Sequence, residues 1–418
     1  MSIGYACLTV GVPETGMKTC LMKNASRHRL SQLIANNLKS LDNIMDYNIE
    51  NGIQLFRISS DLIPFGSHPV NDIEWCKEFS PQFKTIGDKI KKHDMRVSMH
   101  PGQYTVLNSP DKGVVARAVE DLNYHAKVLD CLDLEKKHKI ILHIGGAYGN
   151  KGKSMERFMD NYHELSNSVK DRLVIENDDR SYNIAEVLKI GLILNLPVVL
   201  DNLHHKVNPP DINKSETSWI GECRLTWSEE DGMQKVHYSQ QDSERRPGAH
   251  SNSIAIGEFM DFYSKLNGDK IDIMLEVKDK NLSAIKCINC ISDDSTIKVL
   301  EEEWSKYKYN ILEKSPKGYT QIRNLLKDKT TYPAVEFYSV IEGAMSQPER
   351  VGYAVNALEH VWGYFKNEAT PKEKERFSKQ SQNYKNGQIN LRVVKRFLGR
   401  LALKYDRQYL LDSYYFTL

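Results

Sequence analysis

Short apolar runs alternate with longer stretches of helical spacing over the first 280 or so residues. The runs are rich in β-branched residues and end at polar or turn residues, which is typical of strands buried on both faces. The stretches between them are long enough for a helix, so the repeated unit is a strand followed by a helix. Eight runs are expected to form strands, at 3–10, 53–59, 96–100, 139–146, 172–177, 197–202, 235–240 and 272–278.

Eight strands alternating with helices are the number that a closed (β/α)₈ barrel, or TIM barrel, requires. The predicted helices of this barrel span 30–49, 81–93, 114–132, 155–169, 185–194, 219–229 and 254–266. Ser154 and Asn183 stand where N-caps are expected, directly before helical stretches. The pattern therefore predicts the α/β class and this architecture.

The pattern changes after the eighth strand. Residues from about 282 onward show no strand alternation and helical spacing throughout, with many Lys, Glu and Tyr. Examples are the stretches 297–314, 335–345, 351–365 and 390–405. We predict a barrel domain over 1–293 and a smaller all-α domain over 294–418.

Composition limits the classes of protein that need consideration. The chain has 418 residues, 40% of them hydrophobic and 27% charged, which is ordinary for a globular protein. It has no run of eighteen apolar residues and no basic leader with an apolar core, so we expect no membrane segment and a cytoplasmic location. The seven scattered cysteines predict free thiols in a reducing compartment. Cys287 and Cys290 have no second pair to complete a zinc site, and helix packing is the interpretation we adopt for them.

Charge is unevenly distributed. The net charge is +2, yet residues 371–407 contain eleven Lys or Arg against three acids. The remainder therefore carries a net −6, which suits a region of carboxylate ligands. The basic stretch, around Arg392, Lys395, Arg396 and Arg400, is either a solvated helix face or a surface that faces DNA.

Residues able to bind metal follow most of the predicted strands. The active site of such a barrel lies at the carboxyl ends of its strands and in the loops that follow. Each histidine alone is more often a hydrogen-bonded packing residue than a ligand, but a buried cluster would be costly unless it were paired or bound metal. The residues gathered at this rim are His68, His100, His143, Glu176, Asp201, His204, Lys235, His237, His250 and Glu276.

The types of ligand restrict the metal and the chemistry. Imidazoles and carboxylates without thiolates suit manganese, zinc, magnesium or iron. The ligands outnumber the needs of one ion, so two or three ions are expected, with Glu176 as the bridging carboxylate. Clustered divalent ions are well suited to phosphodiester hydrolysis. Sugar isomerisation also uses paired ions on this fold, so metal ligands alone leave both reactions open.

A set of sequence blocks resembles the UV-damage endonuclease family. The blocks FRISSDLIPFGSHP, RVSMHPGQY, HIGGAYGNKGK, IENDDRSYN, VVLDNLHHKVNP, KVHYSQQ and RRPGAH occur in the family's order. They cover nearly all of 4–278, and it is their combination that is specific. The helical stretches containing SPKGY, VNALEHVWGYF and YKNGQINL are similar to a separate domain of uncharacterised function.

The resemblance implies a DNA repair endonuclease that cuts a strand of damaged duplex DNA immediately 5′ to a lesion. Cyclobutane dimers and 6-4 photoproducts would be the main substrates, with some cutting at abasic sites. It also implies three divalent ions, with Mn²⁺ the first choice and Mg²⁺, Zn²⁺ or Co²⁺ as alternatives. Glu176, Lys235 and His237 are expected to be catalytic, and the ten residues gathered above to hold the metals.

Lys235 and the residues expected to contact DNA have chemistry that differs from that of the imidazole and carboxylate ligands. An ammonium cannot bind a cation, so Lys235 is either a carbamate formed with CO₂, as the family resemblance suggests, or a plain catalytic or phosphate-contacting cation. The family places a Gln-Tyr pair against an extruded lesion, and Gln103 and Tyr104 match it. Tyr5 is expected on the same side, and Arg57 and Lys151 are candidates for phosphate contact.

Three other interpretations remain open on sequence. An abasic-site endonuclease of a related metal barrel is the nearest. A metal-dependent sugar isomerase or epimerase would have no basic DNA channel and no Gln-Tyr wedge. In the third, the helical domain is a partner-binding module and the barrel is its scaffold.

Overall fold

The computed structural model describes residues 1–418, which divide into two compact units. The first unit comprises residues 1–254 and 261–285, and the second comprises 255–260 and 286–418. The division falls after Ile285, within helix α11, so it lies a few residues before the predicted boundary at 293.

The first unit is a closed barrel of eight parallel strands in chain order. All eight predicted strands are confirmed, each shorter than its apolar run. Their bounds are β1 Ile3–Ala6, β2 Leu55–Ile58, β3 Arg96–Met99, β4 Lys139–His143, β5 Leu173–Glu176, β6 Val198–Asp201, β7 Lys235–Tyr238 and β8 Asp272–Leu275. Closure comes from β8, in which Ile273 pairs with Ile3 of β1.

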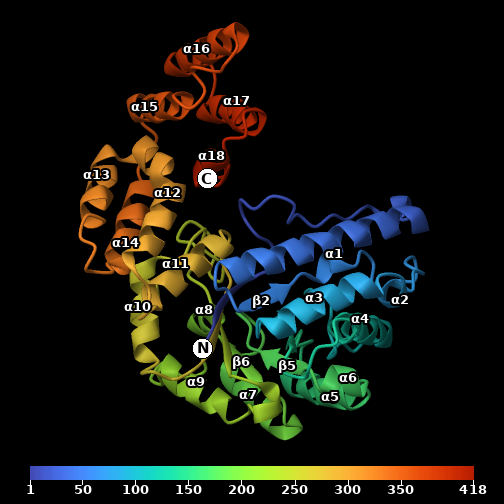
Figure 1. Cartoon of the computed structure of the whole chain (residues 1–418). Helices are drawn as coiled ribbons and strands as arrows, with labels where there is room; N and C mark the ends of the chain where they lie inside the picture. Colours follow the sequence, from blue (N-terminus) through green and yellow to red (C-terminus); the bar gives the residue numbers. More distant parts are fainter. The chain divides into compact units, whose positions relative to one another are not determined.

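Helices follow the strands and surround the barrel, as Figure 1 shows for α1 and α3 beside β2. Their bounds are α1 Arg27–Glu50, α2 Trp75–Glu78, α3 Ser80–Lys92, α4 Lys112–Cys131, α5 Lys151–His163, α6 Asn167–Lys170, α7 Ile184–Leu194, α8 Asn202–Val207, α9 Glu216–Arg224, α10 Ile256–Lys265 and α11 Asn281–Ile291. Short 3-10 turns lie at Met22–Asn24, Ser60–Leu62 and Glu229–Asp231.

Two of the predicted helix ends test the capping argument. Asn183 caps α7 with a complete capping box, in which the Glu186 side chain accepts from the Asn183 backbone N–H. The predicted N-cap at Ser154 is wrong. Helix α5 begins at Lys151, and its N-cap is Asn150, whose side chain accepts from the Lys153 N–H. Ser154 is instead buried within that helix. Asn150 is itself a good capping residue, and it starts the helix one turn earlier.

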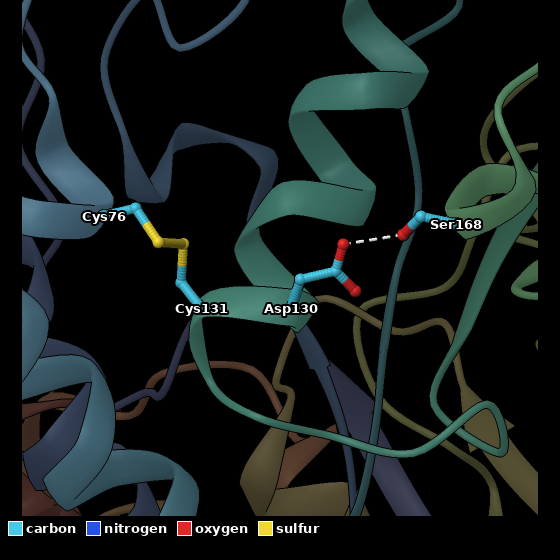
Figure 2. The surroundings of a disulfide bond; sticks show 4 residues. All are labelled: Cys76, Asp130, Cys131 and Ser168. Carbon is cyan, nitrogen blue, oxygen red and sulfur yellow. Dashed lines mark hydrogen bonds between the residues drawn. A yellow bond between two sulfur atoms is a disulfide. The ribbon is translucent and has the colours of Figure 1, made fainter.

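A disulfide joins Cys76 in α2 to Cys131 at the end of α4 (Figure 2). The prediction of free thiols throughout is therefore wrong at these two positions. The two cysteines are 55 residues apart in sequence, and the fold brings their Cα atoms to 5.7 Å. Next to it, Asp130 accepts a 2.6 Å hydrogen bond from Ser168 of α6, so the end of α4 is held on two sides.

Buried ion pairs close the end of the barrel where the strands begin. Arg96 of β3 lies 2.9 Å from Asp272 of β8, and Lys139 of β4 pairs with Asp231. The Ser2 backbone N–H also donates to Asp272. These bonds tie the first and last strands together at the end opposite the predicted ligands.

The second unit is helical, as predicted, and has its own core. Its helices are α12 Ile297–Lys314, α13 Pro316–Leu325, α14 Ala334–Met345, α15 Val351–Trp362, α16 Pro371–Lys385, α17 Leu391–Lys404 and α18 Gln408–Leu411, with a 3-10 turn at Tyr414–Phe416. Apolar faces of α12, α15, α16 and α17 pack together with the final turn. No helix of the chain is long and apolar enough to cross a membrane.

Candidate metal centre

The parallel barrel brings residues from six strands to one rim. His143, Glu176 and Asp201 are the last residues of β4, β5 and β6, and His100 and Glu276 directly follow β3 and β8. In the sheet, His143 is the register partner of Glu176, and Asp201 is the partner of His237 in β7. Side chains from strands that are far apart in sequence are therefore neighbours at this rim.

Glu176 lies at the centre of this rim and is only 1% exposed. Its Oε1 is 2.7 Å from Nδ1 of His237, and its Oε2 is 3.0 Å from Nε2 of His100. Nε2 of His143 lies 3.7 Å from the same Oε2. Imidazoles from three strands thus surround one carboxylate.

Three groups of side chains could each hold a metal ion, and Glu176 belongs to all of them. The ligand atoms within each group lie within 4.8 Å of one another. The groups are His100, His143 and Glu176; Glu176, Asp201 and His204; and Glu176, His237 and Glu276. A carboxylate shared in this way is suited to bridge adjacent ions.

Asp201 and His204 are positioned by the start of helix α8. Asp201 is its N-cap, and its Oδ1 accepts a 2.7 Å hydrogen bond from the His204 backbone N–H. His204 Nδ1 donates to the carbonyl of Asn177 at 3.1 Å. Asp201 Oδ2 is buried without a hydrogen-bond partner, so one oxygen holds the helix and the other remains available as a ligand.

Glu276 connects the last strand to the cluster. It pairs with the guanidinium of Arg57, and its Oε1 lies 3.2 Å from His237 Nδ1. Its other oxygen is 3.8 Å from His250 Nδ1. Five imidazoles form a continuous arc with neighbouring ring centroids 5.2 to 6.3 Å apart, in the order His237, His100, His143, His204 and His250.

Charge within the cluster favours ionised carboxylates. Burial alone would raise the pKa of Glu176, but His237, His143 and His100 together hold it well below its usual range. Burial likewise opposes ionisation of Glu276, and Arg57 and His237 nevertheless lower its pKa. The pKa of His204 is raised to about 9, because Asp201, Glu176 and Glu276 outweigh the effect of burial. Negative charge at this rim thus attracts protons or other cations.

Three buried atoms of this cluster have no hydrogen-bond partner, and they fit a metal site. They are Nε2 of His237, Nδ1 of His143 and Oδ2 of Asp201. Leaving such an atom unpaired in a protein interior normally costs about 1–3 kcal/mol. Because all are imidazole nitrogens or carboxylate oxygens, the donor set fits Mn²⁺, Mg²⁺ or Zn²⁺ and excludes a thiolate site.

Lys235 lies two residues before His237 in β7 and is 1% exposed. Its Nζ is buried and has no hydrogen-bond partner. Burial, with the positive charge of Arg96, holds the pKa of this amine well below its usual range. The structure thus places a buried amine without a hydrogen-bond partner inside the barrel.

His68 and His250 do not belong to the three groups. His68 is exposed in the loop after β2, where its Nδ1 accepts from the Val70 N–H at 3.0 Å. It lines a separate hollow of about 740 Å³ with Arg117 and Lys127. His250 lies at the edge of the cluster, with its Nδ1 3.8 Å from Glu276 and its ring 6.3 Å from that of His204.

Gln103 and Tyr104 lie in the loop after β3, and both are exposed. Tyr104 is 83% exposed, which is unusual for an aromatic residue. The loop follows His100 directly, so these side chains stand next to the ligand cluster in sequence. Their placement agrees with a contact to a large partner.

The other predicted DNA contacts are placed differently. Tyr5 is fully buried, and its hydroxyl donates to Asn48 Oδ1 at 2.8 Å, so the expectation that Tyr5 contacts DNA does not fit this structure. Arg57 is largely buried and holds Glu276. Lys151 is half-exposed and lies 2.8 Å from Glu186, and both pairings were missed because they depend on the tertiary fold.

Asn177 supports the cluster, and sequence reasoning missed it. Its Oδ1 accepts from the Asp201 N–H at 2.9 Å, and its carbonyl accepts from His204. It thereby fixes two ligands of the second group. Its position directly after Glu176 at the end of a strand could have indicated this role. An amide at such a position is common for other structural reasons, so the sequence alone did not single it out.

Comparisons with known proteins agree with this geometry. The family model described as UV-endonuclease UvdE matches residues 1–308, and a model for a protein of unknown function, DUF1722, matches residues 308–418. A protein named UV DNA damage endonuclease from Clostridium perfringens is 40% identical over 91% of this chain and 92% of its own length. One of the same name from Bacillus cereus strain Q1 is 36% identical over 66% of this chain and 88% of its own.

One solved structure agrees as well. A crystal structure titled SacUVDE matches with a TM-score of 0.66 and 36% identity, covering 70% of this chain and 98% of that one. The match extends over nearly the whole of that protein and over a part of this chain the size of the barrel.

Proposed function

Because the chain belongs to the UV-endonuclease UvdE family, we propose that it nicks damaged duplex DNA immediately 5′ to a UV photoproduct by metal-assisted hydrolysis. The products would be a 3′-hydroxyl and a 5′-phosphate, and the main lesions cyclobutane dimers and 6-4 photoproducts. The observation that carries the proposal is the buried Glu176, shared by three groups of metal-competent side chains at one barrel rim.

Two or three divalent ions, with Mn²⁺ as the first choice, would be held by these three groups. When bound, such ions supply Lewis acidity and a hydroxide-like water at neutral pH. Glu176 would link the ions. Arg57 and Asn177 would hold Glu276, Asp201 and His204 in place, because each forms direct hydrogen bonds to one or two of them.

Three further residues complete the proposed set of metal-binding residues: His250, His68 and Lys235. His250 would join through its position beside Glu276. His68 would join from the loop after β2 through its Nε2, because its Nδ1 already accepts from the Val70 N–H. Lys235 would act as a carbamate: once deprotonated, its buried Nζ would bond to the carbon of CO₂, lose a further proton to solvent and then present carboxylate oxygens. A native mass spectrum at neutral pH should show an increase of one CO₂ that is absent in Lys235→Met and is lost on acidification, and an unmodified native mass at saturating bicarbonate would contradict this role.

Gln103 and Tyr104 would recognise the lesion. A damaged pair is poorly stacked, so extruding it from the duplex costs less than extruding a normal pair. The exposed Tyr104 ring would fill the space that is left in the stack, and Gln103 would hydrogen-bond to the bases there. Replacing Tyr104 with Ala should reduce the preference for damaged over intact duplex by about tenfold, since aromatic stacking on a base contributes about 1–3 kcal/mol.

The Tyr104 experiment is a competition between the two duplexes, with Tyr148→Ala as the matched control because Tyr148 is also an exposed tyrosine of a barrel loop. Unchanged discrimination in the Tyr104 variant would remove this residue from lesion recognition. An equal loss in both variants would likewise do so.

The proposed function is tested by a nicking assay with Mn²⁺ on a duplex with one defined cyclobutane dimer. An undamaged duplex and one with a single abasic site run beside it, and the new ends are mapped. A single cut adjacent to the dimer on its 5′ side supports the proposal. Equal cutting of damaged and intact duplexes, or cutting of the abasic duplex alone, would contradict it, the latter in favour of an abasic-site endonuclease.

A further inference from the structure

Helix α17 of the second unit presents three arginines along one exposed face. Arg392, Arg396 and Arg400 follow each other at four-residue intervals and are all exposed. The opposite face, which includes Val394, Leu398 and Leu401, is buried in the core of the unit. We call Arg392, Arg396 and Arg400 the arginine stripe.

The stripe has no acidic partners, although its basic neighbours do. Lys395 is mostly buried and lies 3.3 Å from Glu313, and Lys404 lies 2.7 Å from Glu373. Arg407 pairs with Glu368. Lys395, which the sequence grouped with the stripe, is thus a structural residue. The remaining three guanidinium groups face solvent.

A fourth exposed arginine lies on the neighbouring helix α16. The Arg376 guanidinium carbon is 4.9 Å from the centre of the Phe397 ring of α17. Phe397 directly follows Arg396 in the chain. The positive surface therefore continues from α17 onto α16.

Repulsion within the arginine stripe destabilises helix α17 in the free protein. Like charges four residues apart on a helix destabilise it by roughly 0.2–0.5 kcal/mol per pair. Neighbouring charges are about 6 Å apart along the axis at 1.5 Å of rise per residue, so the stripe extends over about 12 Å. Guanidinium groups bind phosphate in a two-pronged geometry that ammonium groups cannot match. A row of phosphates would offset the repulsion and use that geometry.

We propose that the arginine stripe binds the phosphate backbone of duplex DNA, independently of sequence and of the lesion. The proposal rests on DNA being the substrate of this enzyme family and not on where the strand is cut. It assigns to the helical domain a second DNA contact.

The surroundings of the arginine stripe favour duplex DNA over a membrane surface or a protein as its partner. A membrane-surface helix needs an exposed apolar face, and that of α17 is buried. A protein partner needs a desolvated apolar or aromatic centre for its interface. Leu403 is the one large exposed apolar residue on the helix, at 70% exposure. A charged and almost wholly polar face is what a nucleic-acid backbone requires.

The test compares the full-length protein with the triple variant R392Q/R396Q/R400Q. Binding to intact duplex is measured by fluorescence anisotropy in EDTA between about 50 and 200 mM salt. Each phosphate contact contributes about 0.9 to the slope of log affinity against log salt, so the slope should become shallower by about 2 to 3. At the lowest salt the affinity should fall at least about tenfold. The loss should be equal on a dimer-containing duplex, because phosphate contacts carry no sequence information.

The matched control removes three positive charges elsewhere on the same unit. Lys298, Lys317 and Lys327 are exposed and lie on or next to α12 and α13, so K298Q/K317Q/K327Q should keep the wild-type slope. If the triple arginine variant does not fold, single variants should each lose about 0.9 of the slope. An unchanged slope in the arginine variants, or an equal loss in the control, would overturn the proposal.

Two further arms separate the alternatives. In the first, vesicles with anionic phospholipid replace the duplex. If the wild type binds the vesicles but not DNA, and the triple variant no longer binds the vesicles, the proposal is overturned in favour of a membrane. Because the DNA measurement uses intact duplex in chelator, it does not depend on cutting. If the nicking assay fails but the arginine variants still have a shallower salt slope, the proposed function is contradicted and the DNA-binding role of the arginine stripe is retained.

Discussion

Glu176 places one carboxylate against His100, His143 and His237, all within 3.7 Å. Its replacement by Gln keeps the size of the side chain but removes the negative charge that the three groups share. We expect incision by Glu176→Gln to fall by more than about 100-fold, since even supporting residues of metal sites typically contribute 10–100-fold. Binding to intact duplex should change little.

The measurement is single-turnover cutting of the dimer duplex beside anisotropy on the intact one. Glu164→Gln is the control, because Glu164 is exposed at the end of α5 and belongs to none of the three groups. Near-normal cutting by the Glu176 variant would exclude this carboxylate from the reaction.

His138 illustrates a pH effect outside the metal cluster. It is buried, its Nδ1 accepts from the Val97 N–H at 3.1 Å, and burial lowers its pKa to about 3. In the unfolded chain a histidine titrates near 6.5. The neutral form is therefore favoured in the folded protein, and its contribution to stability is complete above about pH 6.5 and is lost as the pH falls toward 3.

His138→Asn retains an acceptor for Val97 and removes the titration. Between pH 7 and pH 5 the wild type should lose about 2 kcal/mol more unfolding free energy than this variant, at about 1.4 kcal/mol per pH unit below 6.5. Urea unfolding at the two pH values measures the difference. Parallel losses in both proteins would show that His138 does not titrate in this way.

At the scale of elements, the bond between Cys76 and Cys131 links α2 to the end of α4 and closes a loop of 55 residues. Such a link restricts the unfolded chain and stabilises the fold by about 2–4 kcal/mol. The double variant C76S/C131S should therefore lose roughly this amount of unfolding free energy under oxidising conditions. Addition of a thiol reductant should lower the wild type to the same value and leave the variant unchanged.

Cys20→Ser serves as the control, because Cys20 is not in a disulfide. A reductant effect of the same size in C76S/C131S would mean that another thiol is responsible. Equal stability of the oxidised and reduced wild type would show that the link contributes nothing.

The strands and most members of the three candidate metal groups could be predicted because both depend on local signals. Buried strands of a parallel sheet are continuous apolar runs, and a polar residue such as Glu176 or Asp201 at the end of such a run is conspicuous. The pairing of Arg57 with Glu276 spans 219 residues and leaves no local trace. The burial of Tyr5 and the approach of Cys76 to Cys131 are likewise products of packing, so the sequence could not distinguish them from exposed positions.

For the whole molecule, metal binding should be coupled to stability. The ligands are assembled only in the folded barrel, so an ion that binds there stabilises the folded state. At about 100 times its dissociation constant, one ion adds about 2.7 kcal/mol. We expect Mn²⁺ to raise the melting temperature of the chelator-treated wild type and to have a smaller effect on His237→Ala.

Differential scanning calorimetry with and without Mn²⁺ measures this shift. His360→Ala is the control, because His360 is an exposed residue of α15 in the second unit. The same shift in wild type and in His237→Ala would place the ion outside the cluster at the barrel rim.

Closure of the barrel has a consequence for when the protein can become a nuclease. His100 lies in the first third of the chain and Glu276 directly follows β8, the strand that completes the ring by pairing with β1. During synthesis, a chain that has not yet emerged past β8 lacks both Glu276 and the ring that aligns the other ligands. We therefore expect nascent and partly unfolded molecules not to cut DNA, and the capacity for incision to arise only once the barrel has closed.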